Sequence, residues 1–130
     1  MHRDDLIAGG SADLVPMPEA IVALAALPDN EPVVMLNLLR FSPGGGARAY
    51  AQYATEFKKI LEDLGGRILF AGRAELLLVG EGHWHHVTLV QYPNRRTFVE
   101  MFEGDAYGKI HANRQAGLEK TLLYALRQVG

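Results

Sequence analysis

Three side chains capable of chemistry recur at helical spacing near the C-terminus: Tyr107, His111 and Arg114. Residues separated by three, four or seven positions share one face of an α-helix, so these three form a row that Leu118 continues. A guanidinium can hold a carboxylate or carbonyl oxygen, an imidazole can move a proton near neutral pH, and a phenol can donate a hydrogen bond. The row therefore predicts either one wall of a cleft for a small anionic or carbonyl-bearing molecule, or a polar face that meets solvent.

The helix that carries this row is expected over Ala106 to Leu118, and it is unusually poor in large apolar side chains. Its neighbouring row reads Ala106, Ile110, Asn113 and Gly117. A helix that packs on a sheet normally shows an apolar stripe over about a third of its circumference. If the polar row faces a cleft, Arg114 anchors the anion and His111 is the candidate acid or base. If it faces solvent, the apolar residues beside it do the packing.

A second group of imidazoles, His83, His85 and His86, begins beside a glycine-rich turn. On a strand, His83 and His85 would share a face at a spacing that two ligands of one metal ion can use, and His86 would face the other way. The alternative interpretation of this group is that the histidines are simply exposed beside the turn. We expect the protein to bind no metal and no cofactor. An inward-facing His86 or His111 could ligate haem only beside a large apolar cavity.

Composition restricts the class of protein. The chain has 130 residues, of which 48% are hydrophobic, enough for one globular domain with a proper core. The formal net charge is −2, and the 13 basic residues form no stripe for nucleic acid. The absence of cysteine excludes disulfides and thiolate chemistry. No apolar run approaches the roughly 18 residues of a membrane span, and no signal peptide is evident, so we expect a cytoplasmic protein.

The elements that must position these residues begin with an N-terminal arm and short helix over residues 1–31, followed by one domain over 32–130. Val33 to Phe41 is the clearest strand, and because both of its faces are mostly apolar, we expect it to be central and covered on both sides. Alternation places Arg40 on the face opposite Asn37. Asn37 is then either a satisfied core amide or a donor that lines a pocket.

A long amphipathic helix follows over Ala47 to Leu64 and ends at a pair of glycines. Arg67 to Val79 and Trp84 to Tyr92 are expected to pair as a hairpin, with Gly72 marking a bulge or a close backbone approach. Thr121 to Val129 alternates well enough to form a fourth strand.

Between the hairpin and that last strand, two short helices are expected. Asn94 can cap the first and Asp105 the second. Arg95 and Arg96 stand at a helix start, the unfavourable end for cations, and we expect them to form a solvated face.

The resulting order, β-α-β-β-α-β, is that of an α+β ferredoxin-like sandwich, and it resembles the dimeric α/β-barrel superfamily. Local motifs are similar to those of its domain-of-unknown-function family 1330. The matching pieces are Met35 to Phe41 (MLNLLRF), Tyr50-Ala51-Gln52-Tyr53, Gly65-Gly66-Arg67, Trp84, Val90-Gln91-Tyr92-Pro93, Phe98, Met101, Tyr107, Arg114 and Ala116-Gly117-Leu118-Glu119. Together they cover Pro32 to about Leu126.

The resemblance implies a homodimer of two facing four-stranded sheets, with a cleft between each sheet and its helices that takes a small organic anion or an aromatic ligand. Superfamily relatives include cofactor-independent monooxygenases, muconolactone isomerases, haem-dependent enzymes and proteins without known activity, so the fold does not fix the function. We expect Arg114 and His111 to be catalytic. The residues expected to bind substrate are Asn37, Arg40, Tyr53, Trp84 and Tyr107.

Three functions remain open at this point. The first is a cofactor-independent isomerase, lyase or monooxygenase that acts on a small carbonyl or carboxylate compound. The second is a ligand-binding or stress-associated protein without turnover. The third is a purely structural dimer whose polar helix row faces solvent. Neither nucleic acid nor a membrane is an expected partner.

Overall fold

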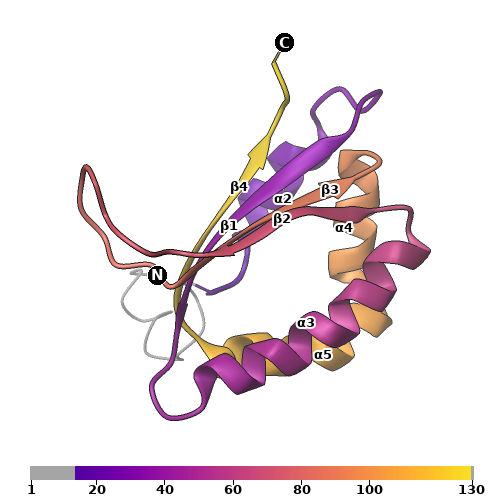
Figure 1. Cartoon of the computed structure of the whole chain (residues 1–130). Coiled ribbons are helices and arrows are strands. Elements are labelled where there is room, and N and C mark those ends of the chain that lie inside the picture. The colour runs from indigo at the N-terminus through magenta and orange to yellow at the C-terminus, as the bar shows by residue number, and fades with distance from the viewer. Residues whose placement is uncertain (1–13, 130) are drawn as a thin grey trace.

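The computed structural model describes residues 14–129, which form a four-stranded sheet with helices on one face (Figure 1). In chain order the elements are α2 (Pro18–Ala25), β1 (Val33–Phe41), α3 (Gly46–Asp63), β2 (Arg67–Arg73), β3 (His86–Tyr92), α4 (Arg95–Glu103), α5 (Asp105–Gly117) and β4 (Leu118–Leu126). The predicted order of strands and helices is confirmed. Of the expected N-terminal arm and short helix over residues 1–31, α2 is the short helix, and the part of the arm over residues 1–13 lies outside the described residues.

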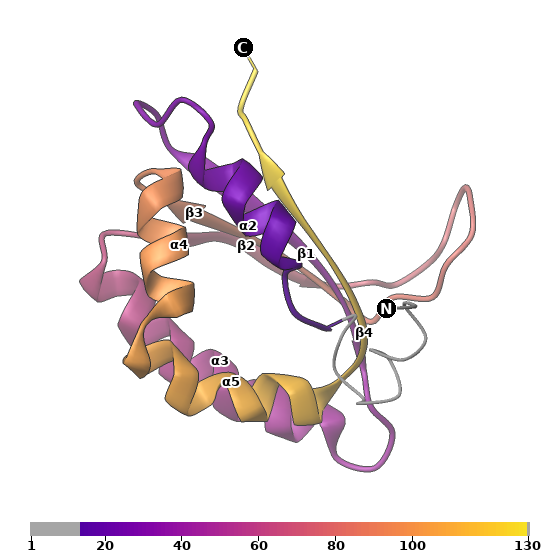
Figure 2. The same ribbon diagram turned by 180° about the vertical axis from the view of Figure 1, so that it is seen from behind.

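The sheet is antiparallel throughout, in the order β2-β3-β1-β4, so β1 is central as expected. Asn37 stands opposite Thr88 of β3 and Leu123 of β4, and these three residues face the helices. Within one chain the helices lie on one face of the sheet only (Figures 1 and 2), so the described residues provide the expected cover of β1 on one side. The other face, called the open face below, carries mainly apolar side chains. They are Val34, Leu36, Leu38, Phe70, Val87, Leu89, Leu122, Tyr124 and Leu126.

The core lies between the sheet and α3, α4 and α5. Its buried members are Val33, Met35, Tyr53, Phe57, Leu61, Val90, Tyr92, Phe98, Met101 and Tyr107. Helices α3 and α5 approach closely at Gly46 and Gly117, where a Cβ atom on either residue would lie 2.8 Å from the carbonyl oxygen of the other. Only glycine permits that approach, and it brings the first turns of α3 against the last turns of α5.

The hairpin differs from its prediction because β2 ends at Arg73 and β3 starts at His86. Ala74 still donates a backbone hydrogen bond to His85, but beyond this pair the chain leaves the sheet and projects away from the helices (Figures 1 and 2). The apolar run from Leu76 to Val79 is exposed there. The register shift lies between Ile68 and Phe70 rather than at Gly72.

Gly72 instead marks a close approach, since a Cβ atom there would lie 2.7 Å from the ring of Phe70. At the other edge of the sheet, β4 starts at Leu118, three residues earlier than expected, because the chain passes directly from α5 into the strand. No described helix combines the length and apolar character needed to cross a lipid bilayer.

The two short helices differ in how they begin. The Asn94 side chain accepts a hydrogen bond from the backbone N–H of Thr97, so the predicted cap of α4 is confirmed. The predicted Asp105 cap is wrong, because α5 begins after Gly104 without a side-chain cap and Asp105 lies inside its first turn. Asp105 is therefore placed to interact with the helix dipole only.

The expectation of a solvated face is wrong for Arg95, which is 3% exposed. Its guanidinium donates to the carbonyl of Pro28 and pairs with Glu31 at 3.9 Å. The Asp29 carboxylate accepts hydrogen bonds from the backbone N–H groups of both Arg95 and Arg96. These contacts offset the unfavourable position of a cation at a helix start. They also fasten the segment after α2 to the first turn of α4.

Candidate functional site

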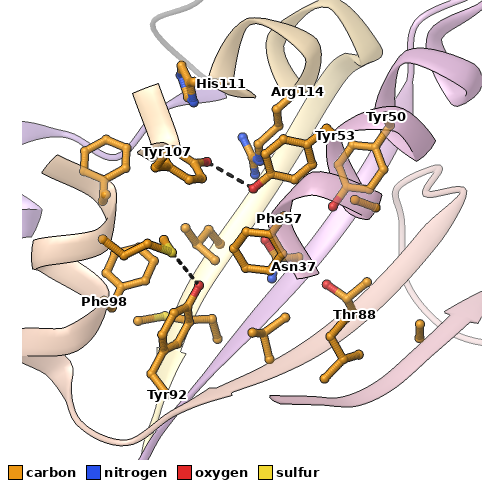
Figure 3. A pocket seen from close by; sticks show the side chains of 18 of the residues that line it. Asn37, Tyr50, Tyr53, Phe57, Thr88, Tyr92, Phe98, Tyr107, His111 and Arg114 are labelled. Atoms are coloured by element: carbon orange, nitrogen blue, oxygen red, sulfur yellow. Dashed lines mark hydrogen bonds between the residues drawn. The ribbon is translucent and has the colours of Figure 1, made fainter. Parts of the chain in front are cut away.

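A cavity of about 140 Å³ lies between the sheet and the helices (Figure 3). The sheet contributes Met35, Asn37, Ile68, Ala71, His86, Thr88, Val90, Tyr92 and Leu123 to its lining. The helices contribute Tyr50, Tyr53, Ala54, Phe57, Phe98, Met101, Phe102, Tyr107, His111 and Arg114, and Pro16 closes one side. An engineered cavity of nearly this size, about 150 Å³, binds benzene. The space therefore suits a ligand of roughly one ring.

Arg114 is the buried cation of this cavity, with 5% of its surface exposed. One guanidinium nitrogen, Nη1, donates a hydrogen bond of 2.7 Å to the backbone carbonyl of Leu14. In Figure 3 the guanidinium lies beside the hydroxyls of Tyr53 and Tyr107. No carboxylate lines the cavity among the residues that the structure describes. A buried cation without a carboxylate is stabilised by an anion or by additional hydrogen-bond acceptors.

The hydroxyls of Tyr53 and Tyr107 lie 3.1 Å apart and form a buried hydrogen bond between α3 and α5. Burial, together with the neighbouring phenol of Tyr107, raises the pKa of Tyr53 well above its usual value, although Arg114 opposes this shift. Burial likewise raises the pKa of Tyr50 to about 12. The phenols of Tyr50 and Tyr53 are therefore neutral near pH 7. One hydroxyl of the Tyr53–Tyr107 pair gives its proton to the other, and the second hydroxyl keeps a proton for a ligand.

His111 lies half-buried at the edge of the cavity, with its ring centroid 5.4 Å from that of Tyr107. Its Nδ1 atom is buried and has no hydrogen-bond partner within the described part of the chain. Burial, and secondly the positive charge of Arg114, lowers the pKa of His111 below its usual value. The imidazole is therefore neutral near pH 7 and can accept a proton.

Five of the seven predicted site residues line this one cavity: Asn37, Tyr53, Tyr107, His111 and Arg114. The polar row of α5 thus faces the cavity rather than solvent.

The other two predicted site residues do not line the cavity. Arg40 forms an ion pair with Glu119, with 2.6 Å between Nε and Oε2, because the alternation of β1 turns it away from the helix-facing side. Trp84 precedes β3 and carries the ammonium of Lys120 5.4 Å above its ring.

Sequence reasoning omitted several polar residues of the cavity from the predicted site. Thr88 and His86 face it from β3, opposite Asn37 and Leu39 of β1. The pairing register between β1 and β3 places both side chains on the helix-facing side of the sheet. The pattern of residues within one strand does not reveal that register. Burial, and secondly the charge of Arg73, lowers the pKa of His86. Tyr92 also reaches the cavity, but its hydroxyl donates to the sulfur of Met101.

The remaining histidines do not join the cavity. His85 accepts a hydrogen bond of 2.9 Å at Nδ1 from the backbone N–H of Phe41, and its ring lies edge-on to that of His83 with 5.1 Å between centroids. Among the described residues, no three His, Cys, Asp or Glu side chains gather closely enough to hold a metal ion. Two imidazoles alone give an incomplete ligand set.

The antiparallel sheet, the helices on one face and the cavity between these layers define an α+β protein of the ferredoxin-like class, as predicted. Residues 46–126 match the family described as Domain of unknown function (DUF1330), and the chain belongs to this family. A protein of unknown function from Rhodopseudomonas palustris is similar over nearly its whole length, with 33% identity, a TM-score of 0.83, and coverage of 92% of this chain and 99% of that one.

More distant structures share the fold alone. A dabb family protein with a ferredoxin-like fold from Mesorhizobium loti is 12% identical, with a TM-score of 0.56, over 76% of this chain and 98% of that one. A hydroxynitrile lyase from Passiflora edulis is 11% identical, with a TM-score of 0.60, over 78% and 98% of the two chains. No curated protein sequence matches this chain.

Proposed function

We propose that the cavity binds a small organic carboxylate or carbonyl compound and that the protein acts on it as a cofactor-independent isomerase, lyase or monooxygenase. The observation that carries this proposal is Arg114, a buried guanidinium in a ring-sized cavity whose described lining holds no carboxylate. A ligand carboxylate or carbonyl oxygen would accept charge-assisted hydrogen bonds from it. The ferredoxin-like fold is compatible with such chemistry, since the Passiflora edulis neighbour is a lyase.

The side chains around Arg114 support a proton transfer at a carbon next to the ligand's carbonyl group. Neutral His111 would take the proton, the C–H electron pair would move to form an enolate, and the negative charge would develop on the oxygen. Arg114 and the free hydroxyl proton of the Tyr53–Tyr107 pair would stabilise that oxygen. Where the ligand carries a double bond conjugated with this enolate, return of the proton from His111 to the far carbon of that double bond would complete an isomerisation.

A binding protein without turnover is the second candidate, and one observation favours it. The buried Nδ1 atom of His111 has no hydrogen-bond partner in the described part of the chain. Catalytic histidines are normally held in one orientation and tautomer by a partner at the other ring nitrogen. Turnover of a bound compound separates the two candidates, because both require Arg114 to hold the ligand.

Calorimetric titration with benzoate, a one-ring carboxylate, tests the shared part of the proposal. Replacing Arg114 with glutamine removes the charge and is expected to weaken benzoate binding by about tenfold to a hundredfold. The matched control is Arg96→Gln, which removes an exposed guanidinium on α4. Native mass spectrometry of the gently purified protein would show any retained ligand. Full benzoate affinity in the Arg114→Gln protein would exclude Arg114 as the anchor.

We also propose a homodimer formed through the open face of the sheet. Nine apolar side chains are aligned there, and Phe70, Leu122, Tyr124 and Leu126 are among the exposed large apolar residues. Monomers rarely expose contiguous apolar patches larger than a few hundred Å². A second copy that presents the same face would cover them symmetrically.

A further inference from the structure

An apolar groove of about 340 Å³ runs beneath α2, next to the cavity. Every side chain that lines it is apolar, among them Ile21, Leu24 and Leu27 on or just after α2, and Ala125 on β4. Met35 and Leu123, which line the groove, also line the cavity on the helix-covered side of the sheet, so the groove is separate from the open face. A space of this kind favours hydrocarbon over water.

Helix α2 covers this groove without filling it. Its sequence is PEAIVALA, yet none of its residues is buried, and Val22 is 70% exposed. The chain is held on both sides of the helix. Before it, Leu14 is buried and its carbonyl accepts the hydrogen bond from Arg114. After it, Asp29 caps α4. An apolar helix that is fastened at both ends and only half-buried between them, where Ile21 and Leu24 pack on the core, can admit a chain beneath it.

The groove and the cavity are neighbours. Pro16, Met35, Phe98 and Leu123 line both of them. Arg114 lines the cavity and does not line the groove, so the charged group and the apolar groove lie on the two sides of these shared residues. A molecule that spans both spaces would meet a cation at one end and only apolar side chains at the other.

We propose that the ligand is an amphiphilic carboxylate whose head lies at Arg114 and whose hydrocarbon tail passes beneath Pro16 into the groove under α2. This inference rests on the proposed binding function and specifies its ligand class. A hydrocarbon tail is the occupant that accounts for a wholly apolar groove beside a cavity that contains a buried cation. A partner protein seated on α2 would account for the groove but not for its position next to the cavity that contains Arg114.

Straight-chain carboxylates from butanoate to decanoate, titrated calorimetrically into the full chain below their micelle-forming concentrations, test this class. Each additional methylene that enters the groove is expected to raise affinity by about fourfold. The substitution Ala23→Phe places a ring in the groove from an exposed position of α2, so it does not threaten the core. It is expected to weaken decanoate binding by about tenfold or more while butanoate binding stays unchanged.

The matched control is Ala25→Phe, because Ala25 is also exposed on α2 but does not line the groove or the cavity. It should bind the whole series like the unaltered protein. If butanoate binding depends on Arg114 but decanoate binds no more tightly, the tail site is wrong and the proposed function stands. If no carboxylate binds, both are wrong.

Two further outcomes would overturn the proposal that the ligand is an amphiphilic carboxylate. Equal decanoate affinity in the Arg114→Gln protein would mean that the chain binds to apolar surface without its head at the cation. A change in sedimentation on Ala23→Phe, with unchanged decanoate affinity, would identify the groove as a contact between protein chains.

Discussion

At the scale of single residues, Arg114 and the phenols around it define what the cavity can recognise. Arg114 lowers the pKa of Tyr50 and of Tyr53, yet burial outweighs this effect and keeps both phenols neutral. The guanidinium and the hydroxyl proton that the Tyr53–Tyr107 pair does not use are hydrogen-bond donors, so the complementary ligand group is an acceptor such as a carboxylate or a carbonyl oxygen. The same phenols are poor general acids, which leaves His111 as the better proton carrier.

The pH dependence of folding tests the state of His111. Its pKa is lowered in the folded protein, so the unfolded chain binds the proton more tightly. The resulting stability is fully present above the unfolded value of about 6.5 and falls as the pH drops from there through the folded pKa. Urea unfolding measured across this window should therefore show a slope that His111→Gln reduces.

His86 adds to the same slope, because burial also lowers its pKa. The control is His83→Gln, which alters an exposed ring and should leave the slope unchanged. A proton resonance of His111 that titrates above about 6.5 would contradict the lowered pKa. It would also remove His111 as the neutral base of the proposed proton transfer.

At the scale of elements, the segment around α2 joins the cavity to the rest of the fold. The backbone carbonyl of Leu14 accepts a hydrogen bond from Arg114 on α5, and the Asp29 carboxylate accepts hydrogen bonds from backbone N–H groups at the start of α4. The helix between these contacts covers the groove, and its Ile21 and Leu24 side chains pack half-buried against the core. Its position is therefore determined by the polar contacts at its two ends together with these apolar contacts.

Replacing Asp29 with alanine tests one of these ends. The carboxylate accepts two backbone hydrogen bonds from the first turn of α4, so its removal should cost about 1 to 2 kcal/mol of stability in urea unfolding. Asp105→Ala is the matched control, because Asp105 lies in the first turn of α5 without a capping hydrogen bond. It should cost less than about 1 kcal/mol. Equal losses in both variants would show that Asp29 is not a cap.

Patterns within one element predicted much of this architecture from the sequence. A continuous apolar run identified β1, helical spacing identified α3 and the polar row of α5, and Asn94 identified the start of α4. Each signal depends on residues a few positions apart, so it is visible without knowing the fold. The same spacing brought Tyr107, His111 and Arg114 to one cavity wall.

The features that were missed depend on contacts between distant parts of the chain. Arg95 is buried because Pro28 and Glu31 meet it from the α2–β1 connection. The predicted hairpin strand extended to Val79, but no described part of the protein covers the chain beyond Arg73, so apolar character alone did not make a strand there.

At the scale of the whole molecule, the helices cover one face of the sheet (Figures 1 and 2). The cavity beneath them and the open face therefore lie on opposite sides of the sheet. The open face predicts self-association, and Tyr124, which is 57% exposed, lies on it opposite Leu36. The substitution Tyr124→Glu would bury a carboxylate between two copies. It is expected to weaken dimerisation by about tenfold or more, as measured by sedimentation equilibrium.

Gln52→Glu adds the same charge on an exposed position of α3 and should sediment as the unaltered dimer. A monomeric unaltered protein would contradict the dimer altogether. Because the cavity is lined from within one chain, monomeric Tyr124→Glu protein should still bind benzoate through Arg114. If its affinity falls together with dimerisation, the second chain contributes to the site across the sheet. Binding and assembly can thus be tested separately, since the sheet separates the two surfaces.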